Sequence, residues 1–160
     1  MKLFDALISP ILFYVSEVWG IDCNGQLEKD LAELVQNEFL KWLLGVNKYC
    51  NNNACRAEKG RFPMRIEAQC RNFKFWLTLT KNENKLSRIA YNDVKWNENK
   101  AFWSKKIKIL LEQIGLGELW MKAHYADIGI VNMIRQRIKD IELQRWLRPR
   151  PHEDDCKRKR

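Results

Sequence analysis

The sequence has little of what β-rich, fibrous or membrane-spanning proteins need. Only 7 Gly and 4 Pro occur among 160 residues, and polar and apolar residues never alternate over more than four positions. This argues against collagen-like, linker-like and turn-rich all-β chains. No apolar run approaches the roughly 20 residues that span a bilayer. The apolar run near the N-terminus, residues 6–15, contains Pro10 and is followed by no small-residue cleavage site of the kind that a secretory signal peptide has. The sequence therefore predicts a nuclear or cytoplasmic protein that is not secreted and has no membrane partner.

Motifs for catalysis are also lacking. The chain has no complete glycine-rich phosphate loop, no nucleophile elbow and no HExxH motif. Asp154 and Asp155 are adjacent, but they lie in a charged tail, whereas a two-metal polymerase site needs rigidly held carboxylates. Asp127 follows a Tyr-Ala pair as in a polymerase box, but Ile128 stands where the second aspartate would be. We expect no catalytic residues, no cofactor and no enzyme activity.

The cysteines predict neither a disulfide framework nor a metal site. There are five of them, an odd number and too few for a small secreted scaffold. Four residues separate Cys50 from Cys55, which matches no compact zinc motif, and the two histidines are not paired. We expect reduced thiols and no bound metal.

Apolar residues at spacings of three and four are abundant, and they predict helices almost throughout. The expected helices are 2–18, which Pro10 should kink or divide, then 27–43, 51–59, 63–77, 84–95, 103–114 and 130–147. Gly45, Gly60 and Gly115 are expected to end three of them. We therefore predict an all-α fold, an irregular bundle of about six helices. We expect 1–147 to form this helical region and 148–160 to be a disordered charged tail.

The charge is strongly positive and unevenly distributed. The net charge is +9, with −3 in residues 1–53, +4 in 54–80 and +8 in 81–160. Such asymmetry favours an anionic partner, above all nucleic acid. The last four residues, 157–160, are all basic and would suit either a nuclear import signal or an ordinary basic tail.

Basic residues flank two of the apolar stripes. Around the helix that begins at Pro63 they include Arg56 and Lys59. The predicted nucleic-acid-binding residues are Arg61, Arg65, Arg71, Lys74, Lys105, Lys106 and Lys108. The alternative is that these residues form the solvated face of an ordinary bundle. We expect Trp42, Trp76, Trp103 and Trp146 in the core rather than as stacking platforms for bases.

Three segments resemble a known family. Residues 3–14 (LFDALISPILFY) with 16–20 (SEVWG) form the first, and 39–46 (FLKWLLGV) with 58–64 (EKGRFPM) form the second. A weaker third segment has Asp140 followed by Gln144 and Trp146. The second segment is similar to a family pattern F-x-K-x-L-L-G-V followed by E-L-G-R-x-P-L. Together they resemble the thumb and post-thumb region of polyproteins from non-LTR (LINE-like) retrotransposons, a class of transposable element.

The resemblance implies a helical region that lies downstream of the palm of an RNA-directed DNA polymerase and grips primer–template backbone. The family usually has Gly where Val15 stands and Leu where Lys59 stands. The palm with its paired aspartates is missing, so we expect a truncated piece that binds RNA or DNA duplex without sequence preference, with a reverse transcriptase palm as a possible partner in a longer chain. Two alternatives stay open: a helical protein–protein interaction module, and a free-standing basic DNA- or RNA-binding protein.

Overall fold

The computed structural model describes residues 2–20, 30–81, 86–95, 102–122 and 128–147. These residues form helices, turns and short irregular connections, with no strand among them, which confirms the all-α prediction. Six of their nine α-helices have seven residues or more. The elements are η1 (Phe4–Ile8), α1 (Ser9–Leu12), α2 (Ser16–Trp19), α3 (Leu31–Leu44), α4 (Asn52–Glu58), α5 (Met64–Lys81), α6 (Leu86–Lys95), α7 (Phe102–Gln113), α8 (Leu119–Lys122) and α9 (Ile128–Leu147). No described helix is both long and apolar enough to cross a membrane. The predicted tail, 148–160, lies outside the described residues.

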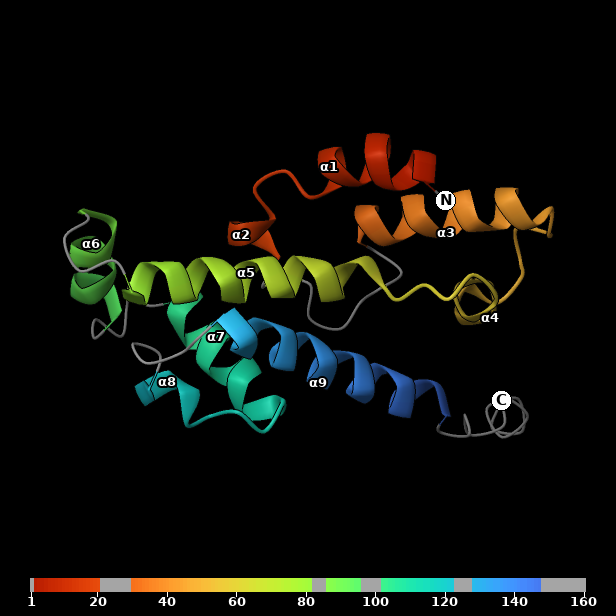
Figure 1. Cartoon of the computed structure of the whole chain (residues 1–160). Coiled ribbons are helices and arrows are strands. Elements are labelled where there is room, and N and C mark those ends of the chain that lie inside the picture. The colour runs from red at the N-terminus through yellow and green to blue at the C-terminus, as the bar shows by residue number, and fades with distance from the viewer. Residues whose placement is uncertain (1, 21–29, 82–85, 96–101, 123–127, 148–160) are drawn as a thin grey trace, which may run out of the picture.

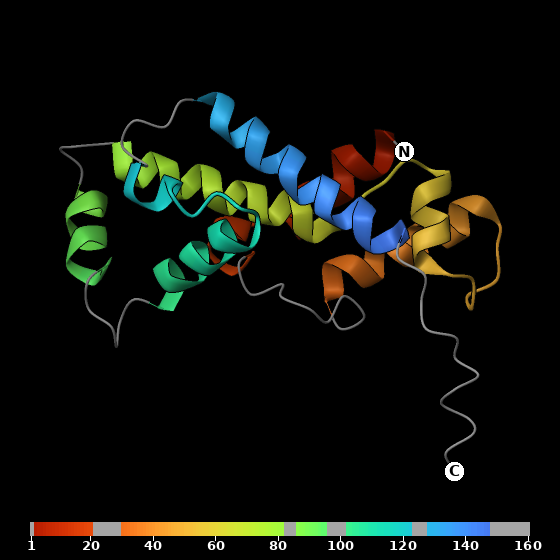
Figure 2. The same ribbon diagram turned by 90° about the horizontal axis from the view of Figure 1, so that it is seen from below.

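Helix α5 is the centre of the arrangement. In Figure 1 it runs through the middle of the molecule, with α1, α2 and α3 on one side and α7, α8 and α9 on the other. Figure 2 shows α9 running diagonally along α5, with α4 and α6 near opposite ends of the bundle. A helix that is covered on two sides must present apolar residues to both, and α5 does so.

The larger core lies between α5, α7 and α9. The stripe predicted for α5 is confirmed, because Ile66, Cys70, Phe73 and Leu77 are all buried. They meet buried side chains of α7 and α9, which include Ile107, Leu110, Leu111, Ile134 and Ile138. A second, smaller cluster covers the other side of α5 and consists of Phe4, Phe13, Ala32, Met64 and Ala68.

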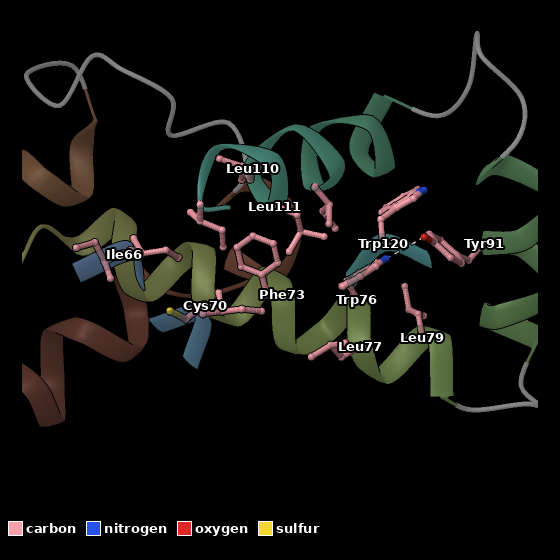
Figure 3. Packing of buried hydrophobic residues seen from close by; sticks show 14 residues of the cluster. Ile66, Cys70, Phe73, Trp76, Leu77, Leu79, Tyr91, Leu110, Leu111 and Trp120 are labelled. Atoms are coloured by element: carbon pink, nitrogen blue, oxygen red, sulfur yellow. Dashed lines mark hydrogen bonds between the residues drawn. The ribbon is translucent and has the colours of Figure 1, made fainter. Parts of the chain in front are cut away.

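Trp76 joins three helices inside the larger core. Its indole is 0% exposed and stacks on Trp120 of α8, with 5.6 Å between ring centroids and 3° between planes. Its Nε1 donates a hydrogen bond of 2.9 Å to the hydroxyl of Tyr91 on α6, as Figure 3 shows. The core prediction is thus confirmed for Trp76. It is wrong for Trp42, which is 76% exposed on α3.

Local signals in the sequence explain where α3 and α4 end and begin. Gly45 terminates α3 with a positive φ of 65°, and the N–H of Val46 reaches back to the carbonyl of Lys41. This is the glycine-terminated cap expected at that position. The side chain of Asn51 accepts a hydrogen bond from the N–H of Asn53 and caps α4, also as expected.

The N-terminal helix divides later than predicted. Pro10 does not break the helix here. It lies in the first turn of α1, where the backbone N–H that proline lacks is not needed for an intrahelical hydrogen bond. The helix before it is widened into the π-helical turn η1. The break comes at Phe13–Val15, and Val15 has a φ of +54°. This is the position at which the family resemblance expects glycine.

Replacing Val15 by glycine is expected to raise the free energy of unfolding by about 1 kcal/mol. A branched side chain in the left-handed region is strained by about 1–2 kcal/mol, and glycine relieves this at an entropic penalty of about 0.5–1 kcal/mol. Val15 is 45% exposed, so little apolar burial is lost. Thermal unfolding should show a rise in Tm of about 2–4 °C. The control V18G lies in α2, where the backbone is right-handed, and it should lower Tm. A fall in Tm for V15G would contradict this account.

Candidate nucleic-acid interface

A groove of about 1110 Å³ lies along one side of α5. Its walls come from η1, α1, the turn 13–15, α2, α3, α5, α9 and the segment 60–63. It continues into a hollow of about 420 Å³ beside α5, α2 and α9. The residues shared by the two are Glu17, Glu67, Arg71, Phe75 and Arg135. We call the two spaces together the α5 groove.

Close packing of α2 on α5 fixes one wall of the α5 groove. A Cβ atom on Gly20, at the end of α2, would lie 2.8 Å from the carbonyl oxygen of Ala68 and 2.5 Å from that of Ser16. The side chain of Asn72 donates a hydrogen bond of 3.1 Å to the same Ser16 carbonyl. The Ser-Glu-Val-Trp-Gly segment therefore ends in glycine because the α5 backbone leaves no room for a side chain.

The walls of the α5 groove have more basic than acidic side chains. The basic residues are Arg61, Arg71, Lys74, Arg135 and Lys139, and the acidic residues are Asp5, Glu17 and Glu67. Arg61 pairs with Asp5 across the mouth, with side chains 29% and 46% exposed. Exposed pairs of this kind are weak and can exchange partners with water or with a ligand.

Glu67 is shared by two arginines from different helices. Its Oε2 lies 3.2 Å from Nη2 of Arg135 on α9, and its Oε1 lies 3.7 Å from Nε of Arg71 on α5. The guanidinium of Arg71 also lies over the ring of Phe13, 4.6 Å from its centroid. One carboxylate thus faces two guanidiniums, while Glu17 lines the same part of the groove.

Two lysines give the groove as a whole its excess of positive charge. Lys74 is exposed on α5 at the edge of the hollow. Lys139 lies on α9, with its Nζ 5.2 Å from the ring centroid of Phe62. Neither ammonium has an acidic ion-pair partner among the described residues. Both are therefore placed to meet an external anion.

Arg65 does not lie on the outer basic face where it was expected. Its side chain lies between α5 and α9, away from the α5 groove, and forms a buried ion pair with Glu142. The side chains of the pair are only 9% and 6% exposed. Trp146 also donates to Glu142, over 3.2 Å, and Arg145 lies 3.5 Å from it. Arg65 therefore holds two helices together and does not belong to an outer basic face.

The three lysines predicted on α7 lie apart from the groove. Lys105 and Lys108 are exposed, on the side of α7 away from the buried Ile107 and Leu111. Lys106 lies over the ring of Phe102, 3.9 Å from its centroid. As far as the structure is described, none of the three lines the α5 groove. The seven predicted residues therefore do not form one surface.

Arg56 also proves to be an interior residue rather than one on a flank. It is 2% exposed and donates hydrogen bonds of 2.6 Å to Glu33 and 3.1 Å to Gln36 of α3. Glu33 accepts a further bond of 3.0 Å from the N–H of Arg65, at the start of α5. Burial raises the pKa of Glu33 and lowers the pKa of Arg56, and the attraction between the two charges opposes both shifts. This pair ties α3, α4 and α5 together.

Sequence reasoning missed the contribution of α9 to the groove. Arg135 and Lys139 are four residues apart, and this spacing places both on one side of a helix. That signal was available, but the sequence does not reveal that this side of α9 faces the basic residues of α5. The thiol of Cys70 is buried beside Arg135, and this burial raises the pKa of the thiol.

Comparison with family models, with curated proteins and with solved structures returns no match to this chain.

Proposed function

We propose that the chain is a non-catalytic helical module that holds the backbone of a nucleic acid in the α5 groove. The observation that supports this most is the set of five cations from α5, α9 and the segment 60–63 along one groove, against three carboxylates. Phosphates bind to such a surface by releasing condensed counterions, which requires cations but no base-specific contacts. The resemblance to the post-palm region of non-LTR retrotransposon polyproteins is consistent with a part that grips primer–template.

The sharpest test compares two pairs of lysines with the same change in charge. The variant K74Q/K139Q removes the two groove ammoniums, whereas K105Q/K108Q removes two from α7. For the groove pair, we expect weaker binding to a generic duplex. The slope of log affinity against log salt should flatten by about 1.8, since each phosphate contact contributes about 0.9. Titrations of a fluorescent duplex at several salt concentrations measure both quantities.

The α7 pair is the control for net charge. If binding is confined to the groove, K105Q/K108Q should leave the slope nearly unchanged. A flatter slope for the α7 pair with an unchanged slope for the groove pair would place the interface on α7 and overturn the proposal. Competition by unrelated sequences should be equal, and a strong preference for one sequence would instead indicate a dedicated DNA- or RNA-binding regulator.

One observation favours a second candidate, a protein–protein interaction module. Large apolar side chains are exposed in and around η1, α1 and α2, where Leu3, Leu7, Ile11, Tyr14 and Val18 are 55–79% exposed. Exposed apolar side chains that gather on a surface are typical of sites that another protein covers. If the parent chain shows no salt-dependent binding to any duplex, this candidate takes precedence over the first.

A further inference from the structure

Glu67 lies between two cations of the α5 groove, Arg71 and Arg135. We propose that in the free protein its carboxylate occupies the position in which a phosphate binds between Arg71 and Arg135, and that it thereby weakens nucleic-acid binding. This inference rests on the proposed function and adds a built-in competitor to the same site. Carboxylates and phosphates present similar acceptor oxygens to a guanidinium, so one position can hold either group.

The contacts of Glu67 are too weak to hold it there against a ligand. Its distance to Arg71, 3.7 Å, exceeds a hydrogen bond, and its contact with Arg135 is one hydrogen bond of 3.3 Å to Oε1 with Oε2 at 3.2 Å. The three side chains are 38–41% exposed. Ion pairs with this exposure contribute about 0–1 kcal/mol, so displacing the carboxylate requires little energy.

The two arginines, in contrast, each have a contact besides Glu67. Arg71 lies over the ring of Phe13, and Arg135 lies beside the buried thiol of Cys70. The Nε of Arg135 is buried and has no hydrogen-bond acceptor among the described residues. When Glu67 swings away, these contacts remain, and the unpaired Nε of Arg135 is a further donor beside the vacated position. A phosphate at this position is repelled by the negative charge of the nearby Glu67 carboxylate, and this repulsion weakens nucleic-acid binding.

The test uses two glutamates of the same groove. Glu17 and Glu67 line both parts of it, but only Glu67 has an arginine partner among the described residues. E17Q and E67Q each raise the net charge by one. We expect E67Q to bind a generic duplex roughly tenfold more tightly than the parent, as for one additional charge-assisted hydrogen bond. For E17Q we expect an increase of threefold at most, from general electrostatics.

The double variant E67Q/R135Q should lose most of the gain of E67Q, because the second guanidinium is needed to use the vacated position. Equal gains for E17Q and E67Q, or a gain that survives R135Q, would overturn the inference. Binding of pyrophosphate, measured by the rise in Tm that it causes, shows whether the position takes a free phosphate compound rather than the backbone of a nucleic acid. A preference for pyrophosphate over duplex in E67Q would indicate a small-anion site.

The same arms distinguish failure of the inference from failure of the proposed function. If neither the parent nor any variant binds duplex, the proposed function fails. Pyrophosphate binding then tests whether Glu67 occupies a phosphate position. This part of the inference stands if E67Q binds pyrophosphate more tightly than E17Q, and it falls if the two variants bind it equally.

Discussion

Replacing Arg65 by glutamine is expected to lower the free energy of unfolding by about 3 kcal/mol. Removing one partner of a buried ion pair leaves the other charge without compensation and destabilises by about 3–5 kcal/mol. We expect the lower end of this range, because Trp146 and Arg145 still contact Glu142. For a domain of this size, whose total stability is about 5–15 kcal/mol, such a loss is large. Urea unfolding followed by circular dichroism measures it.

Arg71 on the same helix provides the matched control. R71Q removes the same charge from a side chain that is 38% exposed and lies 3.7 Å from its nearest carboxylate. Its expected destabilisation is about 1 kcal/mol, mainly from the lost contact with the ring of Phe13. For nucleic-acid binding the order of the two variants is reversed. R71Q should flatten the slope of log affinity against log salt by about 0.9, whereas R65Q should leave this slope unchanged.

Two results would contradict the different roles of Arg65 and Arg71. If R65Q is as stable as the parent and flattens the salt slope, Arg65 is a phosphate contact and its pairing with Glu142 is incidental. In that case the interface extends to the space between α5 and α9 that Arg65, Glu142 and Arg145 line. Equal losses of stability for R65Q and R71Q would also refute the separation of a structural arginine from a binding one.

The fold was largely predictable because helix signals in this chain are local. Residues at spacings of three and four define the stripe of α5, and Gly45 and Asn51 mark helix ends through their own backbone and side-chain preferences. The break at Val15 was not predictable in this way. Pro10 is the stronger helix breaker, but it lies in the first turn of α1, and the break falls instead at Phe13–Val15, just before the helix α2 that packs closely on α5.

The site was less predictable, because a basic residue can serve a surface or the interior. Arg65 and Arg71 are six residues apart on one helix, and both flank its apolar stripe in sequence. Only the position of Glu142 on α9, 77 residues further on, turns Arg65 inward. Arg56 is buried for the same reason, since Glu33 and Gln36 lie on α3. Such partners are distant in sequence, and composition or periodicity carries no signal for them.

The two tryptophans Trp76 and Trp42 should separate core from surface most clearly. Replacing Trp76 by alanine is expected to destabilise the protein by about 3–5 kcal/mol, the range for a buried aromatic. The indole is fully buried between Trp120 and the larger core, and its removal also leaves the hydroxyl of Tyr91 without the Nε1 donor. Because Trp76 joins α5 to α6 and α8, the loss should reduce the protection of both helices from hydrogen exchange.

W42A is the control with the same change in volume. Trp42 is 76% exposed and touches the ring of Phe39 with 5.9 Å between centroids, so its loss should change stability by no more than about 1 kcal/mol. Urea unfolding of the two variants measures the difference directly, and hydrogen exchange localises it. If W42A were as destabilising as W76A, the outer side of α3 would be part of a core, and the apolar surface around it would be covered in the folded protein.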